Sequence, residues 1–85
     1  MKTIVYKTSG TCAREVHLEM DGNTVNEAKF VGGCSGNTQG VSALVKGMDA
    51  NEAVKRLKGI RCGAKPTSCP DQLAKAIELY LTENN

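Results

Sequence analysis

The chain has 85 residues, of which 40% are hydrophobic and 24% are charged. This length is typical of one small domain, residues 1–85, and it excludes a large multi-substrate enzyme acting alone. Such a short chain buries only about 60–65% of the surface that its unfolded form exposes. It also has no Trp, one Phe and two Tyr for its core, so we expect additional cross-links, and the four cysteines are the first candidates.

The charge balance and the hydropathy pattern set the class of protein. Eleven Lys and Arg against nine Asp and Glu give a formal net charge of +2, which predicts neither nucleic-acid binding nor attachment to an anionic membrane. No signal peptide and no run of about 18 apolar residues is seen. The sequence therefore predicts a cytoplasmic protein, and cysteines in a reducing compartment are more often metal ligands or redox thiols than structural disulfides.

The first half of the chain has the signals of three short strands, at residues 3–7, 15–20 and 24–31. In the second stretch Val16, Leu18 and Met20 alternate with polar residues, which is the period of a half-buried strand. Asp21-Gly22-Asn23 predicts a tight hairpin between the second and third stretches, because Asp-Gly readily adopts the positive φ angles that such turns need. These signals predict an antiparallel meander with one face to cover.

The second half predicts three helices, at about residues 37–46, 49–59 and 70–82. Asp49 and Glu52 have the spacing of a capping box, Gly47 and Gly59 end the first two helices, and Pro70 fits a first turn. The apolar side chains expected to face inward are Val41, Leu44, Val45, Ala53, Val54, Leu57, Leu73, Ile77, Tyr80 and Leu81. The predicted fold class is α+β, with the three-stranded meander packed against three helices.

The cysteines Cys12, Cys34, Cys62 and Cys69 all fall at predicted element boundaries, in loops that contain glycine or proline. Cys34 and Cys69 directly precede helices, where unpaired N–H groups and the helix dipole favour a thiolate. A thiolate is what a metal ligand or a nucleophile needs. We therefore predict that these four cysteines gather at one end of the layer and bind zinc or an iron–sulfur cluster.

Two alternatives for the cysteines remain open. The Cys-x-x-Cys pairs of zinc ribbons are absent, so the thiols could instead pack as small hydrophobic groups. They could also form a redox pair, in which Cys69 attacks and Cys62 resolves, because only six residues separate them.

Other polar residues have simple structural explanations. His17 is expected to lie exposed on the polar face of its strand, and Asp71 is favoured in a first helical turn by the dipole. The basic residues Lys55, Arg56, Lys58 and Arg61 fit a solvated helix face. Ser35 and Ser42 have no partner base in the sequence pattern, and we predict no catalytic residues.

Four strings along the chain resemble the TSCPD-domain family: Gly32-Gly33-Cys34, Gly47-Met48-Asp49, Gly59-Ile60 and Thr67-Ser68-Cys69-Pro70-Asp71-Gln72-Leu73-Ala74. The resemblance covers nearly the whole chain, and residues 67–71 match the family's own signature. Family members occur as short proteins and as a domain at the carboxyl end of adenosylcobalamin-dependent ribonucleotide reductases. The resemblance therefore implies an association with ribonucleotide reduction, a step of DNA biosynthesis, and a reductase or another protein as partner.

The reductase activity itself needs more than this chain offers. Ribonucleoside-diphosphate reductase chemistry requires a radical generator, an electron-delivering cysteine pair and a closed barrel that excludes water. Eighty-five residues cannot build that barrel, so the chain is too short to carry the activity alone. The resemblance leaves three roles: a cysteine-ligated metal module, a thiol–disulfide relay that passes electrons to the reductase, or a structural interaction domain.

A second resemblance is to iron–sulfur cluster assembly scaffolds, in which three loop cysteines converge on one site. Cys12, Cys34 and Cys69 are similar to those cysteines in order and context, and residues 30–34 and 45–47 look like the scaffold's central segment. The chain has Arg14 and Ser68 where the scaffolds have an aspartate and a histidine, and it adds Cys62. Four thiolates favour retention over release, so a held ion or cluster is implied.

Overall fold

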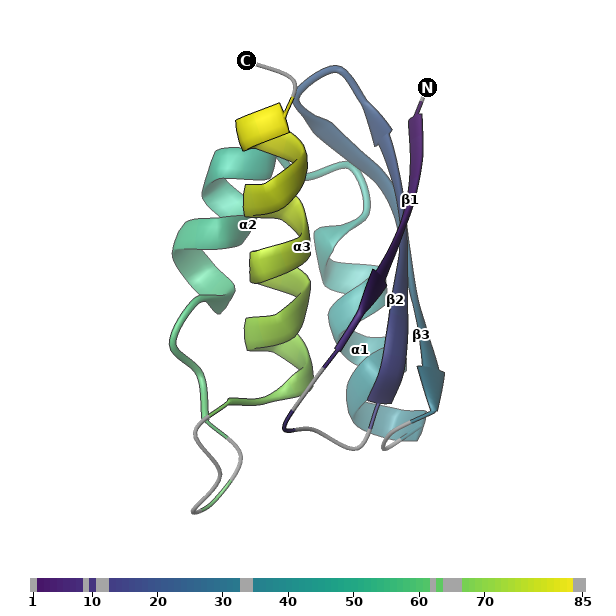
Figure 1. The fold of residues 1–85 in the computed structure, drawn as a ribbon, viewed down its shortest axis with the longest axis vertical. Helices are drawn as coiled ribbons and strands as arrows, with labels where there is room; N and C mark the ends of the chain where they lie inside the picture. The colour runs from purple at the N-terminus through teal and green to yellow at the C-terminus, as the bar shows by residue number, and fades with distance from the viewer. Residues whose placement is uncertain are drawn as a thin grey trace.

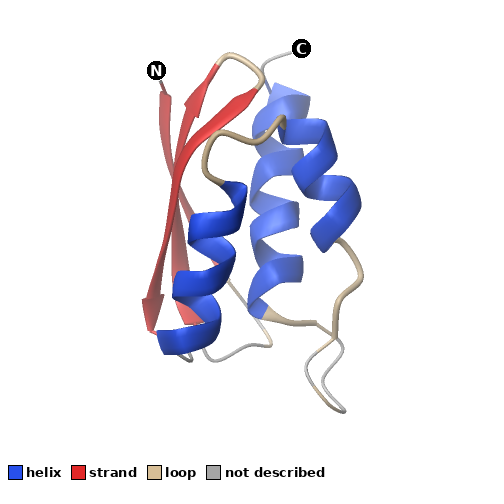
Figure 2. Ribbon diagram, turned by 180° about the vertical axis from the view of Figure 1, so that it is seen from behind, coloured by secondary structure: helices blue, strands red, loops and turns tan. Residues whose placement is uncertain are grey.

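The computed structural model describes residues 2–8, 10, 13–32, 35–61, 63 and 67–83, without the side chains of 35 and 37. The elements follow the order β1 (Lys2–Lys7), β2 (Ala13–Asp21), β3 (Thr24–Gly32), α1 (Ser35–Val45), α2 (Ala50–Leu57) and α3 (Cys69–Glu83). All three helices lie on one face of the sheet, and no described segment covers the other face, which we call the open face (Figures 1 and 2). The predicted α+β fold is confirmed.

The sheet is an antiparallel meander in the order β1-β2-β3, as the strand signals predict. Asp21 pairs with Thr24 around the predicted hairpin turn, and Gly22 has a φ of +59°, which glycine adopts without strain. The outer edge of β3 is bonded to the chain's own backbone at its first residues. Val25 donates to the Met48 carbonyl at 2.9 Å and accepts from the Gly47 N–H at 2.7 Å.

The core lies between the sheet and the helices. Val16, Leu18 and Met20 are fully buried, because their alternation in β2 directs all three to the helical face. Fully buried residues from the other elements are Val25, Val45, Ala50, Ala53, Leu73, Ala74, Ala76 and Ile77. The Tyr80 hydroxyl donates to the Gly22 carbonyl at 2.8 Å and ties α3 to the hairpin. Each fully buried Leu or Ile contributes about 1.5–3 kcal/mol relative to exposure.

Helix α1 differs from its prediction in two ways. It begins at Ser35, two residues earlier than expected, and the buried residues among its described side chains are Thr38, Val41 and Val45. Leu44 was expected to face inward, but it is 75% exposed, so that expectation is wrong. The reason is geometric: successive residues are turned by about 100°, and Leu44 therefore points well away from Val45.

Helix α2 begins as predicted and ends slightly earlier. The Asp49 carboxylate accepts from the Glu52 N–H at 3.1 Å, but Glu52 turns its own carboxylate to Arg56 at 2.7 Å. The helix thus has the predicted Asp49 cap, but the predicted return bond from the Glu52 side chain to the Asp49 backbone is replaced by the pair with Arg56. Ala53 is buried, while Val54 and Leu57 are partly buried against the core. Among the described residues, no helix combines the length and the apolar character that crossing a membrane requires.

Candidate functional site

Of the four predicted metal ligands, Cys69 is the one that lies among the described residues. It is the first residue of α3 and is 6% exposed, so it is more deeply buried than a boundary position suggests. Cys12, Cys34 and Cys62 lie outside the described residues. The structure therefore bears on the predicted site through Cys69 and through the described neighbours of the other three cysteines.

These neighbours lie at one end of the domain. Ala13 follows Cys12 in sequence and pairs with Gly32, which is two residues before Cys34. A Cβ built on Gly10 would come within 2.9 Å of the Thr67 methyl carbon, so the β1–β2 connection lies against the segment that leads into Cys69. The end of β3 and the starts of α1 and α3 all lie at the lower end in Figure 1. We refer to this end of the molecule as the loop end.

Hydrogen bonds hold the β1–β2 connection on both sides of the undescribed residues 11 and 12. The Thr8 hydroxyl donates to the Ala13 carbonyl at 2.5 Å, and the Thr8 N–H donates to the Arg14 carbonyl at 3.1 Å. The ends of this connection are thus fixed to each other. The bond between Thr8 and Ala13 could not be predicted from the sequence, because Thr8 reaches this partner only when β1 and β2 pair in this register.

Ser68 is the N-cap of α3 and also a tether to the preceding loop. Its hydroxyl oxygen accepts from the Asp71 N–H at 3.2 Å, which satisfies one of the free N–H groups of the first turn. The same hydroxyl donates to the Ile60 carbonyl at 2.6 Å. A serine hydroxyl has one donor and two acceptor positions, so both bonds form together.

Asp71 is a buried carboxylate with partners in two segments. One oxygen accepts from the Gly59 N–H at 2.8 Å, and the other accepts from the Thr67 hydroxyl. Lys75 lies 3.8 Å away, and the Gln72 side-chain amide donates to the Thr67 oxygen at 3.0 Å. The helix dipole, which favours an acidic residue in a first turn, therefore explains only part of the stabilisation at Asp71, because the carboxylate also accepts hydrogen bonds from Gly59 and Thr67.

The environment of Asp71 shifts its pKa. Burial raises the pKa, but the hydrogen bonds from Thr67 and Gly59, together with the positive charges of Lys75 and Lys58, outweigh burial. The net effect holds the pKa of Asp71 below its ordinary value of 3.8. The side chain is thus an anion at neutral pH, and it bonds two segments that flank position 62.

Two basic residues, one in α2 and one at its C-cap, lie in ion pairs on the surface. Arg56 pairs with Glu52, and Lys58 pairs with Glu78 of α3 at 3.0 Å. Their side chains are 65% and 60% exposed, as expected for a solvated face. His17 lies on the open sheet face, 3.2 Å from the Glu15 carboxylate.

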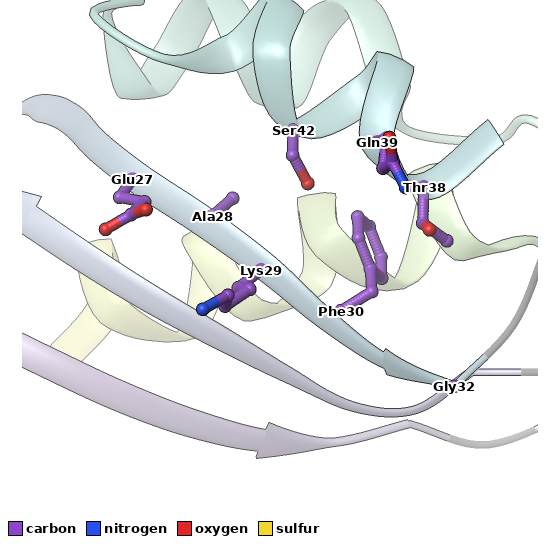
Figure 3. Close-up of a pocket in the computed structure, with 8 residues that line it drawn as sticks. All are labelled: Glu27, Ala28, Lys29, Phe30, Gly32, Thr38, Gln39 and Ser42. Carbon is purple, nitrogen blue, oxygen red and sulfur yellow. The ribbon is translucent and has the colours of Figure 1, made fainter. Parts of the chain in front are cut away.

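A groove of about 500 Å³ runs between β3 and α1. Phe30 projects from β3 toward α1, while Thr38 and Ser42 project from α1 into the same space (Figure 3). The described residues that line it are Glu27, Ala28, Lys29, Phe30, Gly32, Thr38, Gln39 and Ser42. No sequence pattern predicted this groove, because it arises only where α1 crosses the outer strand.

The described residues contain no group of three or more His, Cys, Asp or Glu side chains that could hold a metal ion. A site with three or more such ligands would thus need at least one of Cys12, Cys34 and Cys62, which lie outside the described residues. The sequence analysis did not assign Thr67, Ser68 or the Gly59 partner of Asp71 to the site. The Ser-x-x-Asp spacing of residues 68–71 is a capping signal that could have drawn attention to them.

Comparisons with known proteins give one match. No curated protein and no solved structure was found to match the chain. The family model of the TSCPD domain matches residues 2–81, which is almost the entire chain, and the match includes all six elements except the last two residues of α3. The chain therefore belongs to the TSCPD domain family.

Proposed function

We propose that the protein is a small cysteine-ligated metal module, which binds zinc or an iron–sulfur cluster through Cys12, Cys34, Cys62 and Cys69. One observation carries this proposal: the described neighbours of Cys12 and Cys34 meet at the loop end, where Cys69 is buried. Zinc–sulfur bonds are about 2.3 Å long, so four ligands far apart in sequence must converge in this way.

The surroundings of Cys69 fit a metal ligand. A metal ligand is a thiolate, and the amino-terminal end of a helix stabilises negative charge. Cys69 opens the fifteen-residue helix α3, and its burial would shield a metal–sulfur bond from water. The four thiols also match the donor set of a structural zinc site, which uses four cysteines or a cysteine and histidine mixture.

The partner proposed for this module is a ribonucleotide reductase. Membership of the TSCPD domain family supports the association, since the family also occurs as a domain of such enzymes. The length of the chain supports a role beside the reductase, because a closed radical-generating barrel needs far more than 85 residues. In this proposal the module works in the cytoplasm and touches protein, without nucleic acid or membrane.

Metal analysis of the protein purified without oxygen tests the proposal. We expect about one zinc per chain, or iron with sulfide, and Cys69→Ser should lose that metal. Ala74→Ser is the control, because it also places a hydroxyl at a buried position of α3 and leaves all four thiols. Metal-free wild-type protein with full stability would rule the module out.

The thiol–disulfide relay is the second candidate. The tie between Ser68 and Ile60 favours it, because it holds the two ends of the loop between Cys62 and Cys69 close together. The burial of Cys69 weighs against it, since an attacking thiol must be reached by its partner. A Cys62–Cys69 disulfide that thioredoxin reduces reversibly, in a protein without metal, would favour the relay.

A further inference from the structure

Strand β1 is an outer strand of the sheet with one edge left over for pairing (Figure 1). Residues 3–7 pair with β2 on one side, and no described segment is hydrogen-bonded to their other side. The start of β3, the other outer strand, is instead bonded to Gly47 and Met48. An exposed strand edge readily pairs with a strand of another chain, and β1 is the more accessible of the two edges.

Strand geometry shows which main-chain groups this edge presents. The Thr8 N–H donates to the Arg14 carbonyl of β2, so the main chain of Thr8 faces β2. In an antiparallel pair, the main-chain groups of successive residues point alternately toward and away from the partner strand. The N–H and C=O groups of Thr3, Val5 and Lys7 therefore point outward, where a second strand can bond to them.

The apolar side chains of β1 lie on both faces of the sheet. Ile4 and Tyr6 are partly buried and pack against the core on the helical face. Val5 pairs with His17 on the open face and is 54% exposed, although it is a large apolar residue. A second strand beside β1 would cover all three side chains further, because each lies at the outer edge of its face.

We propose that β1 is a dimer interface, at which the β1 strands of two copies of this chain pair antiparallel with Val5 opposite Val5 on a two-fold axis. In this register each Ile4 lies opposite Tyr6 of the other copy, and each Lys7 lies opposite Thr3. A shift by two residues would place a lysine opposite Tyr6 or Val5, and a shift by one would turn apolar side chains to the wrong face. The interface is independent of the proposed metal module.

Charges on the open face favour the same register. Glu19 of β2 lies between Thr3 and Glu27 in one row across the sheet, so two like charges are adjacent. Neither carboxylate has an ion-pair partner among the described residues. In the dimer, Lys7 of the second copy extends this row beside the short Thr3 side chain, about 10 Å from the Glu19 backbone. Lysine and glutamate side chains together span that distance, so each copy supplies a cation to the acidic row of the other.

Sedimentation equilibrium, with a reductant present to prevent disulfides between copies, tests the inference. The wild type should pass from monomer to dimer as its concentration is raised, because so short an interface is reversible. Val5→Lys places two ammonium groups opposite each other on the two-fold axis, and we expect the dissociation constant of its dimer to rise about tenfold or more. Leu44→Lys is the matched control, since it makes the same change at a 75% exposed leucine of α1 and should dimerise like the wild type.

A mixing experiment tests the register and the fold of the variants together. Val5→Glu alone should be as monomeric as Val5→Lys, because two carboxylates then meet on the axis. An equimolar mixture of the two variants should dimerise, since an axis at position 5 brings glutamate and lysine together. A mixture that stays monomeric overturns the proposal.

Amide exchange of the wild type provides a measurement without any substitution. In dilute solution, where the monomer predominates, the amides of Thr3, Val5 and Lys7 face solvent and should exchange rapidly. At concentrations where the dimer predominates, they bond to the second copy and should be protected. A wild type that stays monomeric, exchange at these amides that does not depend on concentration, or an equal loss of dimer in Leu44→Lys would each overturn the proposal.

Discussion

Each polar side chain between positions 67 and 71 has a distinct partner. Thr67 donates to Asp71, Ser68 donates to Ile60, and Asp71 accepts from Gly59. The sequence alone identified Cys69 and Asp71 as lying near a helix start. It could not identify Gly59 or Ile60 as their partners, because those bonds depend on how α2 and α3 pack.

Removal of the Asp71 carboxylate should destabilise the fold. In Asp71→Ala the Gly59 N–H and the Thr67 hydroxyl lose their acceptor in a buried environment, at a cost of about 1–3 kcal/mol. Urea unfolding of the metal-free protein measures this loss. Glu83→Ala, at an exposed position near the end of α3, is the control and should leave the midpoint unchanged. Equal midpoints for the two variants would contradict the prediction.

The depressed pKa of Asp71 predicts a pH dependence of stability. The folded state binds this proton less readily than the unfolded state, whose carboxyl titrates near 3.8. The stabilising contribution is therefore fully present above that pH and is lost as pH falls through the lower pKa of the folded protein. We expect the unfolding free energies of the wild type and of Asp71→Asn to converge as the pH is lowered from about 6 to about 2.5. A constant difference would show that ionisation of Asp71 contributes nothing.

At the scale of an element, α1 contains two glycines whose backbone conformation other residues also adopt. No described atom lies within 4 Å of a Cβ added to Gly36 or Gly40, and neither residue has a positive φ. Gly40→Ala should therefore stabilise the protein by about 0.5–1 kcal/mol, because glycine loses more backbone entropy in a helix than alanine. Thermal unfolding measures the gain.

The same substitution at position 47, Gly47→Ala, should have the opposite effect on stability. Gly47 also has open space around it, but its φ is +82°, which strains any L side chain. This variant should lower the melting temperature while Gly40→Ala raises it. A loss of stability in Gly40→Ala would mean that the glycine has a packing role on the surface of α1.

Two leucines test the observed faces of the helices. Leu73 of α3 is fully buried and Leu44 of α1 is 75% exposed. Leu73→Ala should cost about 2–5 kcal/mol through lost burial and the cavity left behind. Leu44→Ala should change the free energy of unfolding by less than about 0.5 kcal/mol, as at other surface positions. A large decrease in the free energy of unfolding of Leu44→Ala would instead indicate that Leu44 faces inward, as the sequence predicted.

The elements themselves were largely predictable from local signals. Alternation in residues 15–20 and the Asp-Gly turn fixed the β2–β3 hairpin, and Asp49 marked the start of α2. The inward face of α1 was not predictable, because Leu44 and Val45 are adjacent apolar residues and only the contact of α1 with β3 decides between them. The start of α1 at Ser35 lacked a distinctive capping signal in the chain.

At the scale of the whole molecule, the topology explains why loops far apart in sequence share one end. Each of β1, β3 and α2 runs toward the loop end, and β2, α1 and α3 start from it (Figure 1). The sequence predicted that the cysteines lie at element boundaries. Which boundaries meet follows from strand pairing and from the Gly10–Thr67 contact, and neither is visible in a local pattern.

The two outer strands of the sheet differ in how they are held. The start of β3 is bonded to Gly47 and Met48, whereas β1 pairs with β2 alone in the described structure. Local opening begins where few bonds and little buried surface must be given up, so amide hydrogens of β1 should exchange with solvent before those of β2. Fraying of this one strand, and not global unfolding, would then set how often Thr8 separates from its hydrogen-bond partners Ala13 and Arg14 at the start of β2.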